Sequence, residues 1–169
     1  MIGIDNAWEV PLSRGGIYKI VVNDDNLEVY RIFSGRYIQE KLQLKKDMDY
    51  IDSLIVPGAT DYIEPEQLYS DIKHMIEVIT ERYFSIESEK IESIRTEKDP
   101  VDYRLIKFTD INEIKISAGE RERFPELILN GDRYILPPKN FMAFQEEDKK
   151  KYEEYKIIVD DIRKKIGKA

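Results

Sequence analysis

The sequence contains no cysteine and a single histidine. The lack of cysteine excludes disulfide bonds, thiolate zinc sites, iron–sulfur clusters and cysteine nucleophiles. No apolar run approaches the roughly 20 residues that a membrane-spanning helix needs. The first residues also lack the basic start and apolar stretch of a signal peptide. We therefore expect a cytoplasmic protein with no transmembrane segment and no cofactor.

Acidic residues outnumber basic ones, with 34 Asp and Glu against 27 Lys and Arg, so the formal net charge is −7. Proteins that bind a nucleic-acid duplex usually carry a basic face, because phosphate contacts dominate their affinity. The charge balance therefore makes nucleic acid an unlikely partner. Hydrophobic residues make up 41% of the 169-residue chain, enough to bury the core of one ordinary domain or of two small ones.

The first half of the chain predicts strands followed by a helix. Two apolar, strand-forming runs within residues 16–33 flank the turn residues 23–26, which is typical of a β-hairpin. Further strands are expected at residues 37–44 and 50–56. An apolar stripe that repeats every three or four residues predicts a helix over residues 65–83, and Pro65 suits its first turn.

The second half predicts strands at residues 90–96, 103–108 and 111–116, and then a tight hairpin. Its turn is Asn130-Gly131, the pair that best tolerates positive φ at both central positions. Such a two-residue turn places Leu129 opposite Asp132. Residues 127, 129, 134 and 136 then share the more apolar face, which we expect to be buried.

A long amphipathic helix is expected to end the chain, from about residue 145 to residue 166. Its apolar stripe consists of Tyr152, Tyr155, Val159, Ile162 and Ile166. Acidic residues lie at the expected N-terminal end and lysines at the other, as the helix dipole favours. The helix needs a sheet to cover, because isolated helices of this length are marginal in water.

Both halves run from strands to a helix, which suggests a division into residues 1–83 and 84–169. Residues 26–31 can be aligned with residues 90–95, since each segment reads as a strand that ends in arginine. An ancestral duplication would explain this order. The alternative is one sheet interrupted by the helix at residues 65–83.

Several patterns between residues 84 and 166 resemble the small prokaryotic pleckstrin-homology-like domains. They are residues 84–95, residues 103–114, the Asn130-Gly131 hairpin and the terminal amphipathic helix. The resemblance implies an α+β fold: a bent antiparallel sheet, or partial barrel, with one end plugged by the C-terminal helix. A duplication would make two such units in tandem. The resemblance implies binding, oligomerisation or membrane-proximal scaffolding rather than catalysis.

One set of residues suggests an enzyme instead. Asp102, followed by Glu113 and Lys115, resembles the PD-(D/E)xK arrangement of metal-dependent nucleases. There, two carboxylates would hold Mg²⁺ and the lysine would help to activate water. Acid-x-lysine is common in so charged a chain, and it recurs at residues 71–73. A charged outer face of a strand is the preferred explanation of the pattern. His74 falls on the polar face of its helix, where we expect it in solvent.

An apolar segment before the last helix is a candidate for partner binding. It contains Phe141, Met142 and Phe144, and Lys149 and Lys150 follow it. If exposed, these residues would form a patch for a protein or for an anionic membrane surface. The preferred alternative is that the segment tucks under the last helix as a hydrophobic staple. The acidic residues at 146–148 oppose membrane contact.

The sequence therefore predicts a non-enzymatic binding or scaffold protein. Protein–protein interaction or self-association would use the sheet edges or residues 141–144. A divalent-metal phosphodiesterase and a peripheral membrane module are the alternatives. The first is favoured because no constellation of polar catalytic groups accompanies the strands and helices.

Overall fold

The computed structural model describes residues 2–10, 15–41, 65–97, 101–118, 125–137 and 146–167. Its strands are β1 (Gly3–Glu9), β2 (Gly16–Val22), β3 (Asn26–Ser34), β4 (Tyr103–Lys107), β5 (Ile114–Ser117), β6 (Glu126–Leu129) and β7 (Asp132–Ile135). Its helices are α1 (Gly35–Lys41), α3 (Pro65–Glu97), the short 3-10 helix η1 (Phe108–Asp110) and α4 (Glu146–Gly167).

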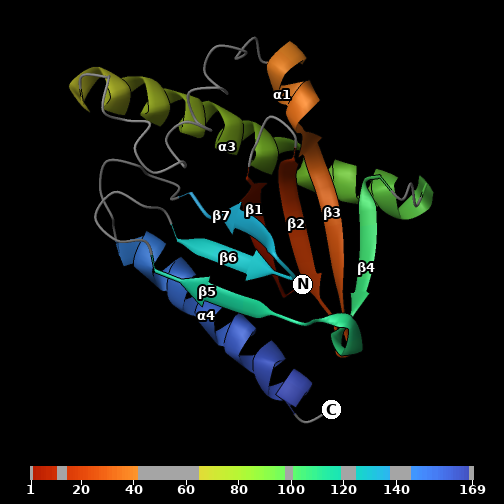
Figure 1. The fold of residues 1–169 in the computed structure, drawn as a ribbon. Coiled ribbons are helices and arrows are strands. Elements are labelled where there is room, and N and C mark those ends of the chain that lie inside the picture. The colour runs from red at the N-terminus through yellow and green to blue at the C-terminus, as the bar shows by residue number, and fades with distance from the viewer. Residues whose placement is uncertain are drawn as a thin grey trace.

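The seven described strands form one open antiparallel sheet, in the order β4-β3-β2-β1-β7-β6-β5. Strands β1 to β4 pair in chain order, and so do β5 to β7. The two sets join where Trp8 on β1 pairs with Ile135 on β7. The expected α+β fold is thus confirmed: an antiparallel sheet, consistent with a partial barrel, has the C-terminal helix against it (Figure 1). Strands from residues 1–83 and from residues 84–169 share this one sheet.

Both expected hairpins are present. At the first hairpin, residues 23–25 separate β2 from β3, within the expected turn at residues 23–26. At the second hairpin, Leu129 pairs with Asp132 and Leu127 pairs with Tyr134, which is the register that the turn predicted. Asn130 and Gly131 have φ values of +49° and +87°, the left-handed values that this turn requires. Leu127 and Leu129 are buried as expected.

Two expected strands are helical. Residues 90–96 continue α3, which runs on to Glu97 rather than ending near residue 83. The alignment of residues 26–31 with residues 90–95 therefore compares a strand with a helix. The strand expected at residues 37–44 was also wrong, because α1 occupies residues 35–41. The Ser34 hydroxyl accepts a hydrogen bond from the Tyr37 N–H at 3.0 Å, which caps the start of α1. The strand expected at residues 50–56 lies outside the described residues.

Both faces of the central strands are buried. On one face, Trp8, Tyr30 and Tyr83 lie in a core that α3 covers, and each is fully buried. On the other face, strands β5 to β7 and α4 enclose a second core around Leu129 and Val159. Figure 1 shows α3 and α4 on opposite sides of the strands. We call these the α3 face and the α4 face.

The last helix matches its prediction. α4 spans Glu146–Gly167, and its buried residues are Tyr155, Val159 and Ile162 from the expected stripe. It contacts β5, η1 and the start of β1. The helix therefore covers the α4 face at Asp5, where Tyr155 and Lys151 meet β1.

Candidate functional site

Strand β4 is the end strand of the sheet and presents an open edge. It pairs with β3 on one side, and no described strand pairs with its other side. Its side chains are mostly exposed, including an apolar one, Leu105, at 51%. Val101, just before the strand, is 64% exposed. Open edges are ready templates for another strand, because their backbone N–H and C=O groups lack a partner.

Two hydrogen bonds fix which backbone groups of β4 point outward. The Arg31 N–H donates to the Asp102 carbonyl at 2.9 Å, and the Phe108 N–H donates to the Asp25 carbonyl at 2.9 Å. Bonded and non-bonded residue pairs alternate along an antiparallel ladder. The even-numbered residues of β4 therefore bond to β3. The backbone groups that face outward belong to Tyr103, Leu105 and Lys107.

On the α3 face, a fixed carboxylate lies beside this edge. Glu28 pairs with Leu105 across the sheet. The Glu28 carboxylate accepts hydrogen bonds from the Tyr30 hydroxyl at 2.6 Å and the Tyr103 hydroxyl at 3.0 Å. Arg95 on α3 donates to the Tyr30 hydroxyl at 2.9 Å. The edge thus carries a negative charge that Tyr30, Tyr103 and Arg95 hold in place.

The pKa shifts within this network follow from the same contacts. Burial opposes ionisation of Glu28, but hydrogen bonds from Tyr30 and from other donors outweigh it and lower the pKa of the carboxyl. Burial, followed by the hydrogen bond to Glu28, raises the pKa of Tyr103 to about 12. Glu28 is therefore ionised and Tyr103 neutral at pH 7. Tyr103 remains a hydrogen-bond donor to the carboxylate.

On the α4 face, a shallow cavity of about 190 Å³ lies beside the same strand. Its lining residues come from the first four strands and from the turn before β4: Glu9, Tyr18, Val29, Val101, Asp102, Tyr103 and Arg104. Arg104 donates a hydrogen bond at 3.1 Å to the hydroxyl of Tyr134, whose ring meets the Tyr18 ring edge to face. The cavity reaches Glu9 at the end of β1, and no residue of α4 is among its lining residues.

Tyr18, which lines the cavity, and its neighbour Tyr134 do not act as bases at neutral pH. Burial, aided by a hydrogen bond to Glu9, raises the pKa of Tyr18 well above its usual value. Burial raises the pKa of Tyr134 to about 12, although Arg104 pulls it down. Both hydroxyls stay protonated and can donate and accept hydrogen bonds. The cavity is suited to binding a polar group.

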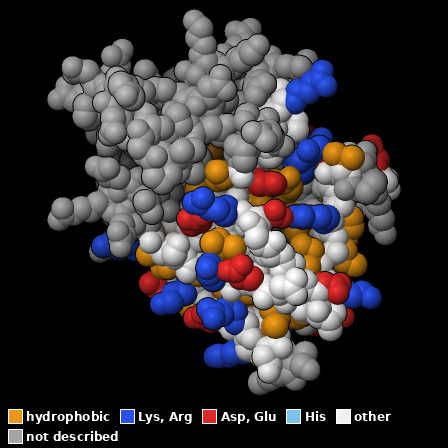
Figure 2. All heavy atoms as spheres, viewed as in Figure 1, with side chains coloured by type: hydrophobic (Ala, Val, Ile, Leu, Met, Phe, Trp, Pro, Cys, Tyr) orange, Lys and Arg blue, Asp and Glu red, His pale blue; other side chains and the backbone are white. Residues whose placement is uncertain are grey.

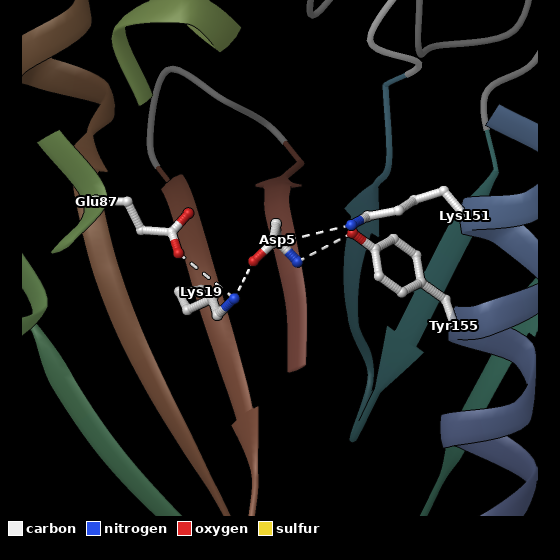
Figure 3. Close-up of polar contacts among 5 residues, drawn as sticks. All are labelled: Asp5, Lys19, Glu87, Lys151 and Tyr155. Atoms are coloured by element: carbon white, nitrogen blue, oxygen red, sulfur yellow. Dashed lines mark hydrogen bonds and ion pairs between the residues drawn. The ribbon is translucent and has the colours of Figure 1, made fainter. Parts of the chain in front are cut away.

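A second polar cluster lies between the two long helices (Figure 3). Lys19 on β2 binds the Asp5 carboxylate on β1 and lies 3.4 Å from Glu87 on α3. From α4, the Tyr155 hydroxyl accepts a hydrogen bond from the Asp5 N–H at 3.2 Å, and Lys151 lies 3.6 Å from the Asp5 carboxylate. The two acids and Lys19 are 9–17% exposed at their side chains. Two carboxylates balance two lysines, so the cluster ties both helices to the sheet.

The buried Asn6 belongs to the same region and was not predicted from the sequence. It has a φ of +52° and lies where the β1–β2 register shifts. Its amide donates to the Thr80 hydroxyl at 3.1 Å and accepts from the Trp8 indole N–H at 2.7 Å. Asparagine tolerates left-handed backbone better than most residues, which was the available signal.

The residues of the phosphodiesterase alternative lie apart. Asp102 is bound by Arg31 at 2.9 Å, just before β4 begins. Glu113 and Lys115 pair with each other at 3.0 Å, at the start of β5 on the opposite edge of the sheet order. The length of β4, about 16 Å at the usual rise per residue, lies between Asp102 and the chain leading to Glu113. In the described part of the chain, no three acidic or histidine side chains form a group that could hold a metal ion.

The candidate partner-binding residues are only partly described. Phe141, Met142 and Phe144 lie outside the described residues, and so does the side chain of His74. Lys149 and Lys150 are exposed near the start of α4. On the described surface in Figure 2, basic and acidic side chains are interspersed. Among the described helices, none is long and apolar enough to cross a membrane.

From the sequence, binding was expected at the sheet edges in general, but β4 was not identified as an edge strand. Which strand ends the sheet depends on the pairing of β4 with β3 across the long α3 insertion. Nothing local in residues 103–107 encodes that partner. Comparisons of the chain with protein-family models, with curated proteins and with solved structures found no match in any of the three.

Proposed function

We propose that this protein is a non-catalytic protein-binding module that takes an extended segment of a protein partner along β4. One observation carries the proposal: the outward backbone groups of Tyr103, Leu105 and Lys107 have no strand partner among the described residues. A peptide that adds as a further strand would satisfy these groups. Strand addition is a general mode of peptide recognition, in which main-chain hydrogen bonds supply affinity and side-chain contacts supply specificity.

The surroundings of β4 support this mode of binding. Leu105 and Val101 offer exposed apolar surface to an added strand. Glu28 on the α3 face and the cavity beside Arg104 on the α4 face offer polar contacts to the side chains that such a strand would project to either face. Each feature lies within reach of one added strand, so backbone and side chains could be recognised together.

The resemblance to pleckstrin-homology-like domains is part of this proposal. The antiparallel sheet with the C-terminal helix against it supports this part of the proposal. Residues 84–95, one of the patterns on which the resemblance rested, lie within the helix α3. A scaffold with an open end strand and no described metal cluster favours binding over the phosphodiesterase alternative.

Selection of short random peptides displayed on phage, with the full chain as bait, tests the proposal. Selected peptides should slow amide hydrogen exchange at residues 103, 105 and 107. Leu105→Pro should abolish their binding, because proline removes an outward N–H while leaving the β3 ladder intact. Leu105→Val is the matched control, since it keeps that N–H and a strand-forming side chain.

The result against the proposal is equally specific. Selected peptides that leave the three amides at their free exchange rates, or that bind Leu105→Pro as well as the parent chain, would place the binding surface elsewhere. A selection that yields no binder to the monomeric chain would remove the support for strand addition.

A further inference from the structure

We propose that the strand that pairs with β4 is β4 of a second copy of this chain, running antiparallel with Leu105 on the two-fold axis. The inference rests on the proposed function, because it needs the edge of β4 to accept a strand. It goes further by naming the partner and the register. The argument uses the alternation of β4, its charges and the position of Glu28.

Symmetry restricts the possible registers to three. A two-fold axis perpendicular to the sheet relates the two copies of β4 and keeps each side chain on its own face. Residues that lie opposite each other must project to the same face, so one residue of β4 lies opposite its own copy at the axis. Within the five-residue β4, only residues 104, 105 and 106 leave most of the strand paired. The three registers differ in the outward backbone groups that they use and in the side chains that they oppose.

Backbone pairing favours Leu105 on the axis. In that register Leu105 bonds to its own copy and Tyr103 bonds to Lys107, so all three outward residues are used. Each such pair exchanges two hydrogen bonds. An axis at Arg104 or at Ile106 leaves one outward residue of each copy without a partner in the other strand. The Leu105 register therefore satisfies the most backbone groups.

Side chains favour the same register. An axis at Arg104 sets that guanidinium directly against its copy, and like charges directly opposite each other destabilise a sheet. An axis at Ile106 sets exposed Leu105 against Lys107. With Leu105 on the axis, two leucines that are each 51% exposed cover each other on the α3 face. Arg104 then faces Ile106 on the α4 face.

Charge complementarity completes the match. In this register Lys107 of one copy lies opposite Tyr103 of the other, whose hydroxyl donates to Glu28 at 3.0 Å. The lysine is thus placed beside an aromatic ring and within reach of an ionised carboxylate. The contact forms twice, once on each side of the axis. The positive charge of Lys107 on β4 of one copy is thus complemented by the negative charge of Glu28 on β3 of the other.

The absence of native cysteine makes the register directly measurable. Opposed residues of a hydrogen-bonded pair lie about 5.5 Å apart at their Cα atoms, inside the range that a disulfide spans. In the full chain under mild oxidation, Leu105→Cys should form a disulfide-linked dimer, whereas Arg104→Cys and Ile106→Cys should not. A mixture of Tyr103→Cys and Lys107→Cys chains should form the mixed dimer, and neither should cross-link alone.

Sedimentation of the unmodified chain should show a monomer–dimer equilibrium that Leu105→Pro abolishes. Leu105→Lys provides a second test, because it retains the backbone N–H but sets two charges against each other on the axis. Circular dichroism and thermal unfolding of each variant establish that it is folded. Loss of the dimer in folded Leu105→Lys would support the register even if Leu105→Pro unfolds the chain.

Three results would overturn the inference. Cross-linking of Arg104→Cys or Ile106→Cys as fast as Leu105→Cys would refute the register. A chain that stays monomeric, while displayed peptides still protect residues 103, 105 and 107, would refute self-pairing and leave the proposed function standing. A monomer that also binds no peptide at this edge would refute both, and Arg104 and Lys107 would then be charges that protect the edge from pairing.

Discussion

Lys19 binds the carboxylate of Asp5 across the first strand pair, at a place nearly closed to solvent. Their side chains are 9% and 15% exposed. Glu87 approaches the same ammonium group from α3, and Tyr155 and Lys151 approach Asp5 from α4. The pair is therefore the point at which both long helices are joined to the sheet through polar contacts.

Removing the lysine should be costly. Lys19→Met leaves two nearly buried carboxylates without their shared cation, and breaking such a pair typically costs about 3 kcal/mol or more. We expect a loss of this size in the free energy of unfolding, measured by chemical denaturation. The control is Lys115→Met, because Lys115 pairs with Glu113 in an exposed position and should change stability by less than about 1 kcal/mol. Equal effects of the two variants would show that burial does not strengthen the Lys19 pair.

The turn at Asn130 holds η1 and the start of β5 in addition to closing its own hairpin. The Asn130 side chain accepts hydrogen bonds from the N–H groups of Asn112 and Glu113, at 2.7 and 3.2 Å, and donates to the Asp110 carbonyl at 3.1 Å. The same residue supplies the positive φ of the turn. One side chain thus links two segments that lie about twenty positions apart in the chain.

Substitutions at Asn130 separate these two roles. Asn130→Ala loses the side-chain bonds and strains the backbone, whereas Asn130→Gly loses the bonds but tolerates the positive φ. We expect both substitutions to lower the melting temperature. Alanine should lower the free energy of unfolding by about 1 kcal/mol more than glycine, because of backbone strain. An Asn130→Gly chain as stable as the parent would contradict the role of the side chain as a clamp.

Acid should weaken the fold partly through Glu28. Its pKa is lowered in the folded chain, so its contribution to stability is fully present above the unfolded value of about 4.3. That contribution is lost as the pH falls through the lower folded pKa. The difference in unfolding free energy between the parent and Glu28→Gln should be constant near neutral pH and shrink below about pH 4. A difference that does not depend on pH would show that the charge of Glu28 contributes nothing.

The parts of the fold that were predicted correctly are those with local signals. Asn130-Gly131 determined its hairpin and register because few other pairs tolerate its backbone. The stripe of Tyr155, Val159 and Ile162 predicted α4 because the period of an α-helix is visible within one segment. Both elements are specified by residues close together in the chain.

The errors came from segments in which two patterns competed. Residues 66–99 contain neither glycine nor proline, and Ile91 and Ile94 continue the buried stripe of Tyr83. Those features extend the helix through residues 90–96, where the isoleucines had predicted a strand. At residues 35–41, the capping serine at position 34 was the overlooked signal.

The candidate site was the least predictable part. Sheet edges were expected as binding surfaces, but β4 became an end strand only through its pairing with β3, more than seventy positions away. The Asp5–Lys19–Glu87 cluster likewise joins three elements that no local pattern relates. Long-range pairing of this kind is decided by packing of the whole chain.

Amide hydrogen exchange along β4 in dilute solution tests the central claim most directly. An open edge predicts that the amides of Arg104 and Ile106, bonded to β3, exchange slowly, while those of Tyr103, Leu105 and Lys107 exchange fast. Slow exchange at all five amides in the monomer would mean that the edge is already covered within the chain, and would contradict the account.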